Sequence, residues 1–282
     1  MNNATAIRRR QWRTALSYSV LIVIAIIFIF PFVIAVVTSF KTEPNATANP
    51  LTLRPNPATT DAFHQLFQDQ DFFLWVKNSL IVTLSVTFLR VFLDSLAGYA
   101  LARLRFRGRG AAFATIVAVM AVPGVVLLIP KFLMIRQLGM YDTYYGMTIP
   151  LLVDAAGVFI MKNFFESIPV SVEESARIDG ASLFRIYWSI VLPMARPALV
   201  TLFILSFQGS WNELAHFIVA SQSTSLNTLT KGVAQLASGQ LGSGNRFPLK
   251  LAASALMTIP VAILFFVFQR RIMNASAGAV KE

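Results

Sequence analysis

The chain of 282 residues is strongly apolar and has a formal net charge of +11. Hydrophobic residues make up 56% of it and charged residues 13%, with a mean hydropathy of +0.64, which predicts a membrane protein rather than a soluble domain. The absence of cysteine excludes disulfides, zinc–thiolate sites and cysteine nucleophiles. Many basic residues flank apolar segments and none forms a patch interleaved with aromatics, so we expect no nucleic-acid partner.

Six apolar segments meet or approach the length of about 20 residues that a transmembrane helix needs. They lie at 16–40, 78–102, 110–134, 143–161, 197–220 and 251–269. The first is too long for a signal peptide and lacks a convincing cleavage site, so we expect it to be retained. The sequence therefore predicts an all-α membrane protein of six transmembrane helices, in one domain over residues 1–282.

The distribution of Lys and Arg predicts the orientation of these helices. If both termini are cytoplasmic, fifteen basic residues flank the spans on the inside and eight on the outside, as the positive-inside rule requires. We therefore expect a multi-pass protein with both termini, and the stretch at 171–193, in the cytoplasm.

Two charged residues of the second span, Arg90 and Asp94, are four positions apart and lie on one helical face. Each costs roughly 2.5–3.5 kcal/mol at a bilayer centre, so we expect a structural ion pair that faces the protein interior. A substrate or gating role is the alternative. Asp154, in the fourth span, is a similar residue without an evident partner.

The cytoplasmic stretch before the fifth span is charged and broken in its middle. Ser171 and Glu174 have the spacing of a capping box, which predicts a helix start. Asp179-Gly180 predicts the end of that helix, because glycine readily adopts the left-handed conformation, and Ser182 predicts the start of a second. Two short helices of this kind form a compact knob that is suited to docking on a soluble partner.

The spacing within this knob matches a known motif. The matching residues are Glu174, Ser175, Ala176, Gly180, Ile190, Leu192 and Pro193. They resemble the EAA loop of ABC importer permeases, E-A-A-x(3)-G-x(9)-I-x-L-P, and Ser175 in place of alanine is the sole departure. Leu192-Pro193 begins the fifth span, since proline is tolerated in a first helical turn.

The resemblance extends over nearly the whole chain. The segments that share it are Ser167-Ile168-Pro169, Ile178-Asp179-Gly180-Ala181-Ser182, Gly209-Ser210-Trp211-Asn212-Glu213 and Ala277-Gly278-Ala279-Val280-Lys281. Together they are similar to the maltose-type, carbohydrate-importing branch of these permeases. The family usually has Asp and Gly where this chain has Glu213 and Glu282.

The resemblance implies a type I ABC importer fold in a prokaryotic cytoplasmic membrane, with residues 171–193 as a coupling loop that docks on an ATPase. The coupling residues that it implies are Glu174, Ser175, Ala176, Asp179, Gly180, Ala181, Ile190, Leu192 and Pro193. It also implies a second homologous permease, two ABC ATPase subunits and an extracytoplasmic sugar-binding protein as partners, besides membrane lipid. ATP and magnesium then bind to the ATPase subunits, and this chain binds no cofactor.

A break in the fifth span offers side chains that suit a sugar. Trp211, Asn212 and Glu213 supply an aromatic face, an amide and a carboxylate in mid-membrane, which can stack on a sugar and bond to its hydroxyls. The alternative is a helix break that packs against the partner permease.

Enzymatic activity is not expected of this chain. Residues 239–246 nearly match a P-loop, but Asn245 and Arg246 replace its lysine and hydroxyl. The isolated His64 and His216 predict no metal site, and no nucleophile motif is present.

The sequence thus predicts a permease subunit of an ATP-driven sugar importer that works by alternating access. An importer of glycerophosphodiesters or amino sugars is an alternative within the same class. An ion-coupled secondary transporter that uses Arg90, Asp94 and Asp154 is the alternative from another class, and a membrane-embedded enzyme is a distant third.

Overall fold

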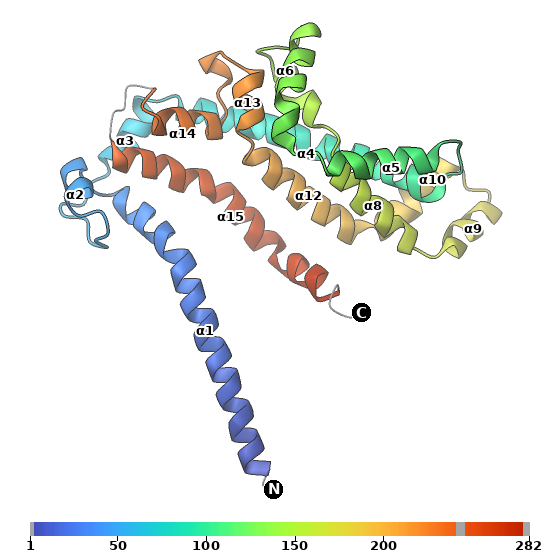
Figure 1. Ribbon diagram of the computed structural model, residues 1–282, viewed down its shortest axis with the longest axis horizontal. Coiled ribbons are helices and arrows are strands. Elements are labelled where there is room, and N and C mark those ends of the chain that lie inside the picture. Colours follow the sequence, from blue (N-terminus) through green and yellow to red (C-terminus); the bar gives the residue numbers. More distant parts are fainter. Residues whose placement is uncertain (1–2, 241–245, 279–282) are drawn as a thin grey trace. The chain divides into compact units, whose positions relative to one another are not determined.

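A computed structural model describes residues 3–240 and 246–278 of the chain (Figure 1). Every regular element in this part is a helix, which confirms the all-α prediction. The chain forms two compact units, Met1–Asp71 with Gln235–Ile259 and Phe72–Ala234 with Pro260–Glu282.

The first unit contains α1 (Asn3–Thr38), α2 (Glu43–Ala48), α3 (Asp61–Gln68) and the first part of α15 (Phe247–Gly278). Thr14–Thr38 of α1 is long and apolar enough to cross a membrane, and so is Phe247–Gln269 of α15. The predicted spans at 16–40 and 251–269 are therefore confirmed as helices. Lys41, just after α1, is buried. Its ammonium group donates hydrogen bonds to the carbonyl of Asn49 at 2.8 Å and to the hydroxyl of Thr52 at 3.2 Å.

The second unit is built around α4 (Phe72–Arg103), which contacts both α8 (Ala155–Ser167) and α12 (Arg196–Trp211). These three helices lie side by side in Figure 1. Gly98 allows the close approach of α4 to α8, since a Cβ there would lie 2.7 Å from the Cβ of Met161. Small residues at such contacts are typical of helices that pack in a membrane.

The remaining three spans are bent rather than continuous. α5 (Arg109–Met120) is followed by η1 (Gly124–Leu127) and α6 (Leu128–Gln137) after a bend of 102° that contains Pro123. α7 (Tyr144–Thr148) and η2 (Ile149–Leu151) meet α8 at 41°. The part of the chain that the structure describes thus has three helices fit to span, or up to six if each bent pair counts as one.

The fifth span was predicted at 197–220 with a break near Trp211. The structure ends α12 at Trp211, before α13 (Ala215–Ala220), which confirms the predicted interruption. The helical segment Leu183–Met194 meets α12 at 79°, a bend that was not predicted.

The segment that follows α13 is held by buried polar side chains. It contains η4 (Thr224–Leu226) and α14 (Leu229–Ala237). Asn78 of α4 donates to the carbonyls of Ser225 and Asn227 at 2.9 Å, and Asp142 accepts hydrogen bonds from the amides of Gln222 and Ser223 at 2.8 and 2.9 Å. These bonds satisfy backbone groups that no helix pairs.

Candidate functional site: the cytoplasmic knob and the helix breaks

The first helix of the knob, α9 (Val170–Ile178), begins before Ser171. Pro169 is its N-cap residue and no side chain caps it, so the predicted capping box of Ser171 and Glu174 is wrong. Pro169 has φ −57° and ψ 132°, and the first helical residue is Val170. Ser171 therefore lies within the helix, where its carbonyl accepts the hydroxyl of Ser175 at 2.9 Å.

The turn after α9 has the predicted form. Gly180 has φ +78°, its amide donates to the carbonyl of Arg177 at 3.0 Å, and the amide of Ala181 donates to that of Ala176 at 3.0 Å. This is a Schellman motif, which needs a left-handed residue after the helix. Ser182 then caps α10 (Leu183–Ile186) by accepting from the amide of Arg185 at 3.4 Å, as predicted.

The knob has a packed face and an open face. Ala176 and Ile186 are 6% and 0% exposed, in a core with residues of α4 and α8, whereas Ile178 and Phe184 are 87% and 66% exposed. Of the predicted coupling residues, the structure packs Ala176, Ala181, Ile190 and Leu192 against this core and leaves Glu174, Ser175, Asp179, Gly180 and Pro193 exposed. The open face thus presents two large apolar side chains, Ile178 and Phe184, among charged ones.

A π-helix, η3 (Tyr187–Val191), connects α10 to α11 (Leu192–Met194), which has Pro193 in its first turn. The hydroxyl of Tyr187 lies 2.8 Å from that of Ser95 on α4, and its ring centroid lies 5.0 Å from that of Tyr99. π-Helical turns are rare and frequent at functional sites.

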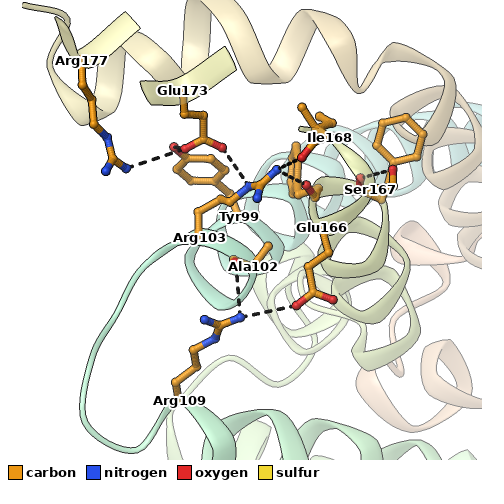
Figure 2. Close-up of polar contacts among 11 residues, drawn as sticks. Tyr99, Ala102, Arg103, Arg109, Glu166, Ser167, Ile168, Glu173 and Arg177 are labelled. Atoms are coloured by element: carbon orange, nitrogen blue, oxygen red, sulfur yellow. Dashed lines mark hydrogen bonds and ion pairs between the residues drawn. The ribbon is translucent and has the colours of Figure 1, made fainter. Parts of the chain in front are cut away.

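A buried polar cluster anchors α9 to the end of α4 (Figure 2). Glu173 accepts a hydrogen bond from the hydroxyl of Tyr99 at 3.1 Å, and its other oxygen lies 2.8 Å from Nε of Arg103. We call these three residues, Tyr99, Arg103 and Glu173, the clasp. Glu173 precedes the EAA motif and Arg103 reads from sequence only as a membrane-flanking charge, so sequence analysis missed both.

The intramembrane charges are arranged differently from the prediction, and no ion pair joins Arg90 to Asp94. Arg90 instead donates from Nε to the carbonyl of Leu151 at 2.7 Å, and Asp94 accepts from the amide of Asp154 at 3.1 Å. Asp154 caps α8 by accepting from the amide of Gly157 at 3.1 Å. The helix break before α8 exposes backbone groups that compete with the partner charge.

The residues at the break after α12 differ in accessibility. Trp211 is 1% exposed and its ring is stacked on Phe207 at 5.7 Å between centroids, so no face of the ring is open in this conformation. Asn212 is exposed, whereas Glu213 accepts from the amide of His216 at 2.9 Å and so holds the start of α13.

No group of three or more potential metal ligands occurs among residues 3–240 and 246–278. His216 is buried, with Nε2 3.1 Å from the carbonyl of Gly146. Of the P-loop-like stretch at 239–246, residues 241–245 lie outside the described part, as do residues 279–282 of the C-terminal motif.

Comparison with known proteins adds three findings. Residues 94–275 match the family described as "Binding-protein-dependent transport system inner membrane component". The chain is 34% identical over 258 residues to the sulfoquinovosyl glycerol transport system permease protein SmoH of Agrobacterium fabrum, covering 90% of this chain and 89% of that one. It is 30% identical over 262 residues to the arabinooligosaccharides transport system permease protein AraQ of Halalkalibacterium halodurans, covering 92% and 93%.

Among solved structures, a chain of a bacterial ABC transporter involved in the import of the acidic polysaccharide alginate superposes with a TM-score of 0.80. The two are 26% identical, and the match covers 93% of this chain and 97% of the other.

Proposed function

The chain belongs to the family of binding-protein-dependent transport system inner membrane components, and from this membership we propose that it is the permease subunit of an ATP-driven carbohydrate importer. It is a multi-pass inner-membrane protein with an α-helical permease fold. The observation that supports the proposal most strongly is the knob at 171–193, which combines the EAA spacing with an exposed apolar face.

The partners follow from the same observation. We propose that a second permease completes the translocation path, that two ATPase subunits hydrolyse ATP, and that an extracytoplasmic binding protein delivers the sugar. Ile178 and Phe184, which the chain itself leaves exposed, are suited to a cleft of an ATPase subunit, because apolar side chains of this size gain by leaving water.

The substrate class rests on the relatives. The matches to the relatives named for sulfoquinovosyl glycerol and for arabinooligosaccharides cover 89% and 93% of those proteins, and the structural neighbour belongs to an alginate importer. We therefore propose a glycoside or oligosaccharide as the substrate.

Within the path, we propose that Asn212 meets the sugar and that Trp211 supports the break by packing. Asn212 is exposed and follows the last turn of α12, whereas Trp211 is covered. An exposed amide can donate to and accept from sugar hydroxyls. We therefore expect Asn212→Ala to lower the sugar transported per ATP hydrolysed, and Trp211→Ala to lower the yield of the complex instead.

Uptake into proteoliposomes tests the function. The chain is reconstituted with a second permease, an ATPase and a binding protein from its source organism, and radiolabelled sulfoquinovosyl glycerol and arabino-oligosaccharides serve as probes. We expect uptake of at least one probe that needs enclosed ATP and persists when a protonophore collapses the ion gradient. Uptake that follows the gradient without ATP would overturn the proposal in favour of an ion-coupled transporter.

A further inference from the structure

Three elements meet at the clasp. Arg103 is the last residue of α4, and Glu173 lies in α9. From Nη2, Arg103 also donates to the carbonyl of Phe165 at 2.6 Å and to that of Ile168, both at the end of α8. In Figure 2 the guanidinium of Arg103 lies between the carboxylate of Glu173 and the carbonyl of Ile168. One side chain therefore joins the first helix of the knob to two spans.

The pair of Arg103 and Glu173 is more buried than the other ion pairs at this end of the unit, although Glu173 also lies 3.8 Å from the exposed Arg177. The side chains of Arg103 and Glu173 are 8% and 2% exposed, whereas those of Arg109 and Glu166, 3.4 Å apart, are 37% and 38% exposed. Exposed pairs are easily replaced by water, but removing one partner of a buried pair leaves an uncompensated charge. The contact between α9 and α4 is therefore hard to break while the fold is intact.

The covalent route from the knob is less suited to transmit movement. Between α10 and α12 the chain passes through the π-helix Tyr187–Val191 and then bends by 79°. Wide helical turns and sharp bends are places where helices yield. A displacement of α9 that travelled along the backbone alone would be partly absorbed there before it reached α12.

We infer that the clasp makes α4 and the end of α8 move with the knob, so that Arg103 and Glu173 are positioning residues that transmit the movement of a docked ATPase to these spans. The inference rests on the proposed function, in which the ATPase docks on the knob. It assigns the transmission to α4 and α8 rather than to α12 alone.

Spin labels test the inference in the assembled complex, without any sugar. The chain contains no cysteine, so cysteines at the exposed Ser171 of α9 and Arg105, two residues after α4, give a unique labelled pair in it. The distance between the labels is measured in the nucleotide-free state and after trapping with MgATP and vanadate. In the otherwise unchanged chain we expect the same distance in both states, because α9 and α4 move together.

Glu173→Gln is the test variant, because it removes the charge but keeps an oxygen for Tyr99. We expect its label distance to shift or broaden when nucleotide is trapped. Arg109→Gln, which breaks the exposed pair with Glu166, is the matched control and should behave like the parent chain. Arg103→Lys is measured in parallel in case Glu173→Gln assembles poorly, since one ammonium cannot replace the fork that reaches three oxygens.

The same distance response in the parent chain and in both clasp variants would overturn the inference, and so would an equal shift in Arg109→Gln. A separate label at Ile178 reports docking. If that label is equally mobile with and without the ATPase subunits, the proposed function fails. If the ATPase immobilises it while the clasp variants behave as the parent does, only the present inference fails.

Discussion

Asp94 shows how a single buried carboxylate can fix the position of a helix. Its side chain is 0% exposed and one oxygen accepts the amide of Asp154 at the start of α8. A Cβ on Gly157 would collide with its other oxygen. The carboxylate therefore fits closely between α4 and α8, in a place that only glycine leaves open.

We expect Asp94→Asn to be tolerated better than Asp94→Leu. Asparagine keeps an oxygen for the amide of Asp154, whereas leucine leaves that buried donor unpaired, which costs about 1–3 kcal/mol. The melting temperature of the purified complex measures the difference, with the surface change Glu166→Gln as control. Equal losses for Asn and Leu would show that the hydrogen bond contributes nothing.

Asp142 gives a prediction on pH. Hydrogen bonds from the side chain and amide of Ser223 hold the pKa of Asp142 below its ordinary value of 3.8. Because the pKa of the folded state is the lower one, the stabilisation is complete above the unfolded value and is lost as the pH falls through the folded one.

We therefore expect the amides of Gln222 and Ser223 to exchange more slowly in the parent chain than in Asp142→Asn. The ratio of the two exchange rates should be constant from pH 7 to about 4 and should become smaller below that pH. Asparagine is a suitable replacement because Asp142 has φ +57°, a conformation that Asn also tolerates. Hydrogen–deuterium exchange across this pH range measures the ratio of the exchange rates. A ratio that already decreased near neutral pH would contradict the lowered pKa of Asp142.

The spacing of Arg90 and Asp94 correctly placed both residues on one face of a helix, but it could not identify the groups to which they bond. Both residues turn to backbone groups, the carbonyl of Leu151 and the amide of Asp154. Those groups are available only because the fourth span breaks before α8, and the break itself was not predicted. Charge spacing on one helix cannot show what the neighbouring helix offers.

At the scale of elements, the turn after α9 requires glycine at position 180 because of its backbone conformation, and not because a side chain there would clash. Gly180 has φ +78°, and a Cβ added there would meet no atom within 4 Å. A left-handed residue other than glycine costs roughly 1–2 kcal/mol, and asparagine tolerates it best. Substitutions should therefore rank by backbone preference rather than by size.

We expect Gly180→Asn to couple ATP hydrolysis to uptake better than Gly180→Ala, and Gly180→Val to be worst. Uptake per ATP hydrolysed, with the probe sugar that the parent complex carries, is the measurement. Gly110→Ala in α5 is the control, since Gly110 is also uncrowded but has no positive φ. Normal coupling in Gly180→Val would contradict both the turn and the role of the knob.

The element pattern was predictable where local chemistry decides it. Asp179-Gly180 and Ser182 end one knob helix and start the next as expected, because these residues bond to their own backbone neighbours. The start of α9 was wrong because the helix begins before Ser171, with Pro169 as its N-cap residue, so Ser171 lies inside the first turn. The bends in three spans were missed because an apolar segment has the same hydropathy whether it is straight or bent.

At the scale of the whole molecule, none of the residues in the most apolar window of α1 is buried by the chain. Composition predicted that such a helix exists but not what covers it, because lipid and a partner helix are equally apolar surroundings. The prediction of a single permease domain over residues 1–282 likewise remains a prediction.

We expect both termini and the knob to be cytoplasmic, which the lack of native cysteine makes simple to test. Single cysteines at Thr47 in α2 and Arg107 after α4, both exposed, should differ in sealed cells. A membrane-impermeant thiol reagent should label position 47 and reach position 107 only after lysis. The reverse pattern would invert the orientation, and labelling of both in sealed cells would contradict the span between them.

The π-helix after α10 explains why the number of residues between Gly180 and Pro193 matters. Every helical residue turns the chain about the helix axis, by about 100° in an α-helix and by less in the wider π-helix, so removing one residue such as the exposed Ser189 would rotate the knob about the helix axis relative to α11. Tyr187 would then turn away from Ser95, and the open face of the knob would point in a new direction with no other change in composition. The number of residues between Gly180 and Pro193 therefore sets the direction in which the open face of the knob points. An insertion or deletion in this interval changes that direction rather than how far the knob extends from α11.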